Sequence, residues 1–68
     1  IAKHSPILGT SLKAADLRNK WSCLVVGLER GAFTITNPHV SLVFEENDLL
    51  WVLGKQKMMN TLIREEIL

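Results

Sequence analysis

The run Cys23–Leu28 constrains the fold most, because it is apolar throughout and contains two β-branched valines. Such a run predicts a strand, which continues here as far as Arg30. Gly31-Ala32 suits a tight two-residue turn with glycine at its first central position. Phe33–Thr36 then alternates apolar and polar residues, as a returning strand with one wet face does. The sequence therefore predicts a β-hairpin that turns at Gly31.

The residues before this hairpin predict a short extended segment and one helix. Ile1–Leu8 is interrupted by Pro6, which disfavours helical dihedrals in the residue before it, and Gly9 ends the segment. Thr10 or Ser11 then serves as the N-cap of a helix over Leu12–Lys20. The apolar positions at helical spacing are Ala14, Leu17 and Trp21.

The residues after the hairpin predict a third strand and a second helix. Asn37-Pro38 ends the second strand, and Val40–Phe44 is either a loop that packs apolar side chains or a short edge strand. Glu45–Asp48 reads as a polar turn before a third strand, Leu49–Leu53. An amphipathic helix follows from Lys55. Its apolar stripe comprises Met58, Met59, Leu62, Ile63 and Ile67.

The expected fold class is α+β: a small β-α-β-β-β-α domain over residues 1–68, mainly an antiparallel sheet with two helices on one face. A chain of 68 residues buries only about 60% of the surface that it exposes when unfolded, so it needs additional stabilisation. Its single cysteine, Cys23, excludes an intrachain disulfide and fits a reducing compartment. His4 and His39 lie far apart with no cysteine beside them, which argues against a structural zinc. Self-association is therefore the remaining source of additional stabilisation.

The strand faces also favour self-association. Cys23–Leu28 and Leu49–Leu53 are apolar on both faces, whereas a sheet with one solvated face alternates. Two helices cover one face, so the other is expected to meet a second copy of the domain. The predicted dimer-interface residues are Val25, Gly27 and Ile35, with Gly27 permitting close approach. The alternative is that the chain wraps more completely around an ordinary core.

Charge and hydropathy exclude several classes of partner. The formal net charge is +1, and no basic stripe or interleaving of basic and aromatic residues is present, so nucleic acid is not an expected partner. The apolar runs are too short to span a bilayer, and the start of the chain has no signal-peptide pattern. Because the chain begins at Ile1, we expect a piece of a larger protein.

No pattern in the chain predicts catalysis or a cofactor. The serines have no glycine-flanked elbow, and the glycines do not gather into a phosphate-binding loop. Cys23 begins a core strand, where a cysteine acts as a small buried hydrophobe. Glu45, Glu46 and Asp48 are clustered carboxylates in a turn that we expect to be solvated. We therefore predict no enzyme activity, no cofactor and no metal.

The candidate ligand-binding residues lie near the hairpin: Arg30, Asn37, Pro38 and His39. An arginine and an asparagine close to a two-fold interface suit a phosphate or a base edge. The alternative is that Arg30 is a solvated charge at a strand end, Asn37-Pro38 is a turn and His39 is an exposed loop residue. Trp21 and Trp51 could stack on a ring, but aromatic residues at core periodicity are usually core.

In order and spacing, a series of short motifs resembles the TrkA C-terminal domain, also called the RCK C-terminal domain, over about Ser5–Leu62. These motifs are Gly9-Thr10-Ser11-Leu12, Asp16-Leu17-Arg18, Val25-Val26-Gly27-Leu28-Glu29-Arg30-Gly31, Asn37-Pro38 and Asn47-Asp48-Leu49-Leu50-Trp51-Val52-Leu53-Gly54. Two departures stand out. Asn47 replaces the family's usual glycine, and asparagine tolerates the left-handed conformation that such a turn needs. His39-Val40-Ser41 also differs from the family's loop, which leaves the ligand's identity open.

The resemblance implies a dimerising β-α-β-β-β-α fold and a cytoplasmic regulatory role on a cation channel or cation/proton antiporter. It also implies that some relatives bind small ligands, cyclic di-AMP among them, between paired domains. The nucleotide-binding lobe that often precedes the domain is not in this sequence, so no NAD or ATP site is expected.

Three functional hypotheses follow. The first is a cytoplasmic, dimerising regulatory domain of a potassium or sodium/proton transporter, attached to the membrane protein without inserting into the bilayer and sensing a small ligand such as a cyclic dinucleotide. The second is an assembly module that binds no ligand. The third is an effector domain of a transcription regulator.

Overall fold

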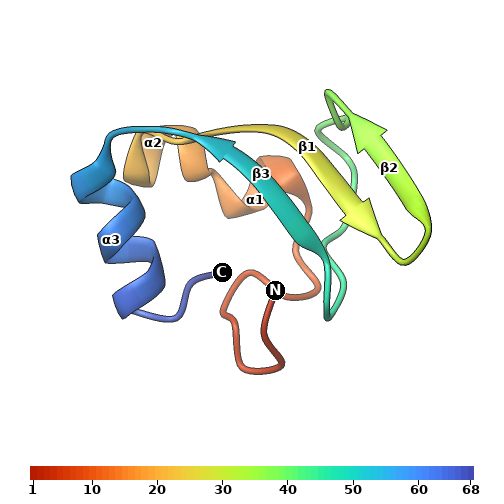
Figure 1. Cartoon of the computed structure of the whole chain (residues 1–68), viewed down its shortest axis with the longest axis horizontal. Coiled ribbons are helices and arrows are strands. Elements are labelled where there is room, and N and C mark those ends of the chain that lie inside the picture. The colour runs from red at the N-terminus through yellow and green to blue at the C-terminus, as the bar shows by residue number, and fades with distance from the viewer.

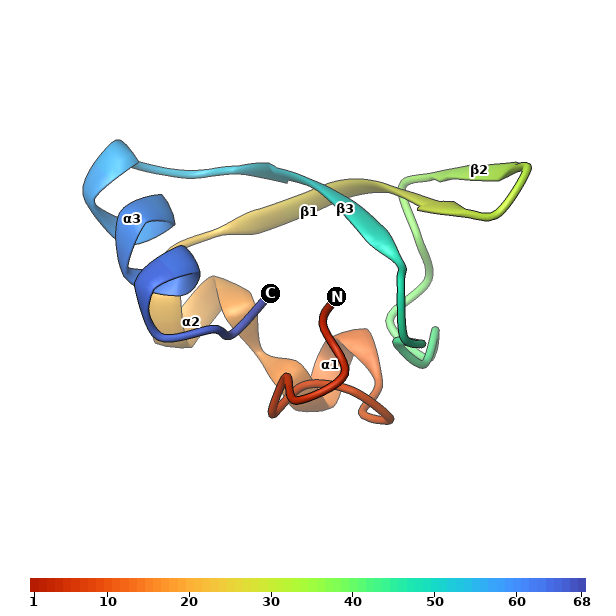
Figure 2. The same cartoon turned by 60° about the horizontal axis from the view of Figure 1, so that its bottom comes forward.

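The computed structural model describes residues 1–68 as three strands and three helices. The helices are α1 (Leu12–Ala15), α2 (Leu17–Trp21) and α3 (Gln56–Arg64), and the strands are β1 (Leu24–Arg30), β2 (Phe33–Thr36) and β3 (Leu49–Leu53). The strands form one antiparallel sheet in the order β2-β1-β3 (Figure 1). All the helices lie on one face of this sheet (Figure 2). The predicted α+β class is confirmed.

The hairpin of β1 and β2 has the predicted position and turn. Arg30 pairs with Phe33 and Gly27 with Thr36, and Gly31 has a φ of +58°, which glycine adopts without steric cost. The pairing of β1 with β3 is irregular, because its register shifts between Val25 and Gly27. Such a bulge inserts one extra residue into the strand. As a result, two residues three positions apart, Val25 and Leu28, both point into the core.

The core lies between the sheet and the helices. Its centre is Leu28 of β1, which is fully buried, together with Leu17 of α2 and Leu62 of α3. Phe44, from the segment before β3, belongs to this core too and is 1% exposed. The remaining core residues are Ile7, Ala15, Cys23 and Val25.

The single helix expected over Leu12–Lys20 is wrong, since the chain breaks at Asp16. Asp16 adopts a left-handed conformation with φ 51°, and its backbone N–H donates to the Leu12 carbonyl, which closes α1. Of the predicted apolar positions, Leu17 is buried, but Ala14 is exposed and its neighbour Ala15 is buried instead. The cap is Ser11, whose Oγ accepts a hydrogen bond of 3.1 Å from the Ala14 N–H.

The segment Ile1–Leu8 forms turns instead of the expected strand. The chain after it pairs with the segment before β3: Gly9 donates to the Phe44 carbonyl at 3.0 Å, and Phe44 donates to Thr10 at 2.9 Å. An isolated bridge joins Ser11 to Val43. Val40–Phe44 is therefore a loop that pairs with the start of α1 and packs Phe44 inside.

Helix α3 lies beside α2, at the end of the sheet where β1 begins and β3 ends (Figure 1). Met58, Met59 and Ile67 pack against the core around Leu62, as predicted. Ile63 is 71% exposed, so its assignment to the apolar stripe is wrong. The Ser5 hydroxyl donates to the Ile67 carbonyl, which ties together the two ends of the chain (Figure 1).

Candidate ligand-binding site

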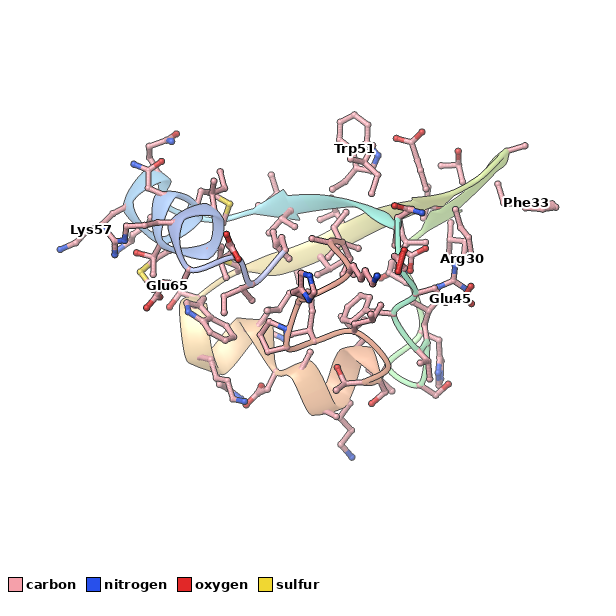
Figure 3. The ribbon with its side chains drawn as sticks, turned by 90° about the horizontal axis from the view of Figure 1, so that it is seen from below. Arg30, Phe33, Glu45, Trp51, Lys57 and Glu65 are labelled. Atoms are coloured by element: carbon pink, nitrogen blue, oxygen red, sulfur yellow. The ribbon has the colours of Figure 1, made fainter.

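The sheet face away from the helices, here called the outer face, is apolar and exposed. Trp51 stands on it (Figure 3) with 56% of its surface accessible. The neighbouring exposed apolar residues on β1 and β3 are Leu24, Val26, Leu49 and Leu53. Because β1 and β3 are apolar on both faces, the sequence predicted an apolar sheet face that the helices do not cover, and the structure has such a face. The alternative of more complete wrapping is wrong for this chain.

A hollow of about 450 Å³ lies on this outer face. Gly27 contributes no side chain to it, and an added Cβ would lie 3.5 Å from the Trp51 ring and from the Ile35 carbonyl oxygen. Glu29 borders it, with its carboxylate accepting a 2.7 Å hydrogen bond from the Trp51 indole. The other lining residues are Val26, Thr34 and Thr36.

The hollow can stack a flat ring on Trp51 and form hydrogen bonds through the two threonine hydroxyls and the Glu29 carboxylate. No cation lines it. Its chemistry within one chain therefore favours a neutral or amino-bearing ring over a phosphate group.

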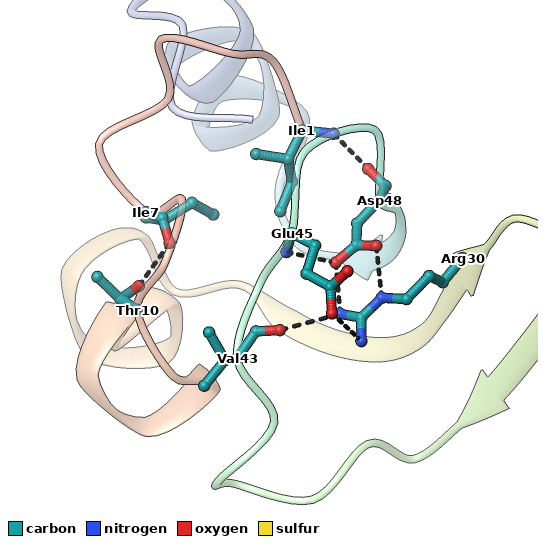
Figure 4. Close-up of polar contacts among 7 residues, drawn as sticks. All are labelled: Ile1, Ile7, Thr10, Arg30, Val43, Glu45 and Asp48. Atoms are coloured by element: carbon teal, nitrogen blue, oxygen red, sulfur yellow. Dashed lines mark hydrogen bonds and ion pairs between the residues drawn. The ribbon is translucent and has the colours of Figure 1, made fainter.

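Arg30 lies away from this hollow, in a cluster that holds the turn before β3 (Figure 4). Its Nε and Nη2 donate to the two oxygens of Asp48 at 2.9 and 2.8 Å. Nη2 also donates to the Val43 carbonyl at 2.9 Å, and Nη1 lies 2.8 Å from Glu45 Oε2. Such a two-pronged, charge-assisted pair fixes geometry strongly. Arg30 therefore joins the hairpin to this turn.

Asp48 is 1% exposed, so the expectation that it belongs to a solvated carboxylate cluster is wrong. The hydrogen bonds from Arg30 hold its pKa below the usual value, and the Glu45 backbone N–H adds to this effect. The same pairing raises the pKa of Arg30. Asn47, just before it, has a φ of 71°, which confirms the predicted left-handed turn.

Asn37, Pro38 and His39 lie at the opposite end of β2 from Arg30. Asn37 is exposed, and its backbone N–H donates to the Val26 carbonyl at 2.9 Å. Pro38 is buried. His39 is exposed, and its Nδ1 accepts from the Ser41 N–H at 3.1 Å. The structure thus separates Arg30 from the other three candidates, and their role in ligand binding stays a prediction.

The three predicted interface residues lie in different places. Gly27 faces outward beneath Trp51. Val25 is 7% exposed and belongs to the core. Ile35 is half-buried and packs against the core from the inner face. Only Gly27 therefore remains in the interface that we propose below.

The sequence patterns did not single out the outer-face residues Glu29, Thr34 and Thr36 as a candidate site. Periodicity assigned Trp51 to the core, whereas the register pairs it with Gly27 on the outer face. The alternation in Phe33–Thr36 did indicate that the two threonines share a wet face. That signal, combined with the glycine opposite, could have located the hollow.

Other chemistry is sparse. No three side chains of His, Cys, Asp or Glu gather in an arrangement that could hold a metal ion. Burial raises the pKa of the Cys23 thiol, which disfavours the reactive thiolate. None of the helices has the length and apolar character needed to cross a bilayer.

Comparison with known proteins assigns the family. The family model described as the TrkA-C domain matches residues 1–66. The chain belongs to this family. The resemblance seen in the short motifs is therefore confirmed, and the domain is a regulatory one. The comparison with curated proteins found no match.

Solved structures share the fold at low sequence identity. The RCK C domain of the potassium transport protein KtrA, in complex with cyclic diadenosine monophosphate (c-di-AMP), has a TM-score of 0.84 at 20% identity, covering 96% of this chain and 76% of that one. The RCK_C domain dimer of S. agalactiae BusR with c-di-AMP has a TM-score of 0.79 at 20% identity, covering 87% of this chain and 78% of that one. BusR of S. agalactiae in complex with its busAB-promotor DNA has a TM-score of 0.83 at 18% identity, covering 97% of this chain and 33% of that one.

Proposed function

We propose that this TrkA-C domain is the cytoplasmic regulatory and dimerisation domain of a cation transporter, and that it senses a small ligand where two copies meet. The outer face carries this proposal, because it is apolar, uncovered by any helix and hollowed beside Trp51. Ligand binding between two copies would change their spacing and so bias the attached protein.

The dimer uses the outer face. Its exposed apolar residues occupy two adjacent strands, and its single carboxylate, Glu29, is already bonded to Trp51. A face of this kind can meet its own copy about a two-fold axis without placing unpaired charges in contact. The BusR domain with the same fold is a dimer, which supports self-association of this chain.

A matched pair of variants tests the dimer. Leu53 is 61% exposed on the outer face and Ile63 is 71% exposed on α3, so Leu53→Lys and Ile63→Lys make the same change on different faces. Sedimentation should find a dimer for the wild type and Ile63→Lys and a monomer for Leu53→Lys. A monomeric wild type at high micromolar concentration would refute the dimer.

A cyclic dinucleotide is the ligand class that we favour, since the c-di-AMP complexes of KtrA and BusR share this fold. In the hollow, a purine can stack on Trp51 and its amino group can donate to Glu29 or to a threonine oxygen. The phosphates would contact residues outside the hollow, because no cation lines it. Asn37 and His39 at the end of β2 are candidates for these outer contacts.

A thermal-shift titration with c-di-AMP, cyclic di-GMP and ATP tests the sensing role. A ligand at 100 times its Kd stabilises the folded state by about 2.7 kcal/mol, which is easily measured. Trp51→Leu should weaken binding about tenfold through lost stacking, whereas Glu46→Gln, in an exposed turn, should leave it unchanged. Stabilisation by none of the three nucleotides would favour the pure assembly module.

A second candidate is the effector domain of a transcription regulator. The observation that favours it is the TM-score of 0.83 to BusR bound to promoter DNA, in which this chain covers 33% of the longer chain. The sequence upstream of Ile1 in the parent gene separates the two: membrane-spanning helices support the transporter, and a DNA-binding domain supports the regulator.

A further inference from the structure

A second cavity, of about 220 Å³, lies between the helix pair α1–α2 and the start of β1. Leu12, Leu17 and Val25 give it apolar walls, and Val40 borders it from the loop before β3. It exists because the chain leaves the sheet at Asn37. The β1–β2 pairing ends there, so no strand covers the start of β1 on that side.

Two cations, Lys13 and Arg18, line the same cavity. On an uninterrupted helix, residues five apart would point about 140° away from each other. The break at Asp16 brings both to one cavity. Neither cation forms an ion pair within the chain. The only carboxylate that lines the cavity, Asp16, accepts a 2.9 Å hydrogen bond from Asn19.

We propose that this cavity binds a small amphipathic carboxylate, with its apolar part against Leu17 and Val25 and its carboxylate near Lys13 and Arg18. An apolar cavity of about 150 Å³ accommodates benzene, so 220 Å³ suits one ring with a short acidic arm. An apolar pocket with a few converging polar groups is the usual form of a small-molecule site. The proposal is independent of the outer-face ligand, because the two cavities share no lining residue.

The test is a titration of the 15N-labelled chain with phenylacetate, followed by NMR. Phenylacetate should shift the amide signals of Leu12, Leu24 and Val40, and the uncharged phenylacetamide should bind more weakly. Shifts centred on the Trp51 indole, equal binding of the amide, or no binding at millimolar concentration would each overturn the proposal.

Two double variants distinguish binding in this cavity from a general effect of the chain's net charge. The double variant Lys13→Ala, Arg18→Ala removes two exposed cations and should weaken phenylacetate binding about fivefold, as expected for exposed ion pairs. The control Lys3→Ala, Lys57→Ala changes the net charge equally at exposed positions outside the cavity and should leave binding unchanged. Val40→Trp, at a half-exposed position on the border, should reduce binding by filling the opening. Equal effects of the two double variants would overturn the site.

Discussion

Replacing Asp48 by asparagine should destabilise the domain more than any other single change of charge in the turn before β3. Asp48 is 1% exposed and accepts two hydrogen bonds from Arg30 and one from the Glu45 N–H. Asparagine keeps the size and one acceptor oxygen, but it loses the charge and one of the two matched oxygens. The Arg30 side chain is 31% exposed, so water can partly replace what it loses.

The expected loss is about 2 kcal/mol, within the range of about 1.5–3 kcal/mol for a hydrogen bond to a charged group. It stays below the roughly 3–5 kcal/mol for breaking a fully buried ion pair, because Arg30 keeps Glu45 and solvent as partners. In a domain of this size each kcal/mol lowers Tm by about 4–8 °C. Thermal unfolding at pH 7 should therefore show a fall of roughly 8–16 °C.

Glu45→Gln is the matched control, because Glu45 contacts the same arginine from a side chain that is 61% exposed. Exposed ion pairs contribute about 0–1 kcal/mol, so this variant should stay close to the wild type. Both variants are compared at one protein concentration, since association also raises apparent stability. Equal Tm values for Asp48→Asn and Glu45→Gln would refute the reasoning.

The pH dependence provides an independent check. The folded pKa of Asp48 lies below its unfolded value, which is about 3.9. Its contribution to stability is therefore fully present above about pH 4 and is lost as the pH falls through the folded pKa. The gap between wild type and Asp48→Asn should shrink below about pH 4. A gap that stays constant down to pH 2 would show that the carboxylate's charge is not the cause.

Three further predictions follow from local geometry. Gly54→Ala would place a Cβ 3.0 Å from Cys23 Sγ and 3.4 Å from the Ser22 carbonyl oxygen, and would displace the flexible end of Met59, so urea unfolding should show a loss of about 1 kcal/mol; unchanged stability would contradict the packing. Ser11→Ala removes the cap of α1 and should cost about 1 kcal/mol in the same assay. Cys23, buried and with a raised pKa, should react with a thiol reagent much more slowly in the folded chain than in guanidinium, and equal rates would show that the thiol is accessible.

Local sequence predicted the features that depend on neighbouring residues. The Gly31 turn, the left-handed Asn47 and the apolar character of both strand faces all follow from residue types within a few positions. These features were sufficient to anticipate an uncovered sheet face. They were also sufficient for the family resemblance, since its motifs lie at turns and strand ends.

Features set by distant contacts could not be read in the same way. Nothing in the residues around Asp16 forbids a continuous helix, and the break reflects how α1 and α2 pack against the sheet. Arg30 and Asp48 are 18 positions apart, and their pairing depends on β1 lying beside β3. The cluster and the smaller cavity therefore follow from tertiary packing, which often overrides local propensity.

The register shift in β1 links the core to the outer-face hollow. In a regular strand, Leu28 facing the core would place Val25 on the outer face, since alternate residues face opposite ways. The extra residue at the bulge instead turns Val25 into the core and leaves Val26 and Gly27 bordering the hollow. Gly27 pairs with Trp51 on one neighbouring strand and with Thr36 on the other. Because glycine has no side chain, the hollow forms between the side chains of Trp51 and Thr36. One irregularity thus accounts for both the misplacement of Val25 in the predicted interface and the position of the candidate site.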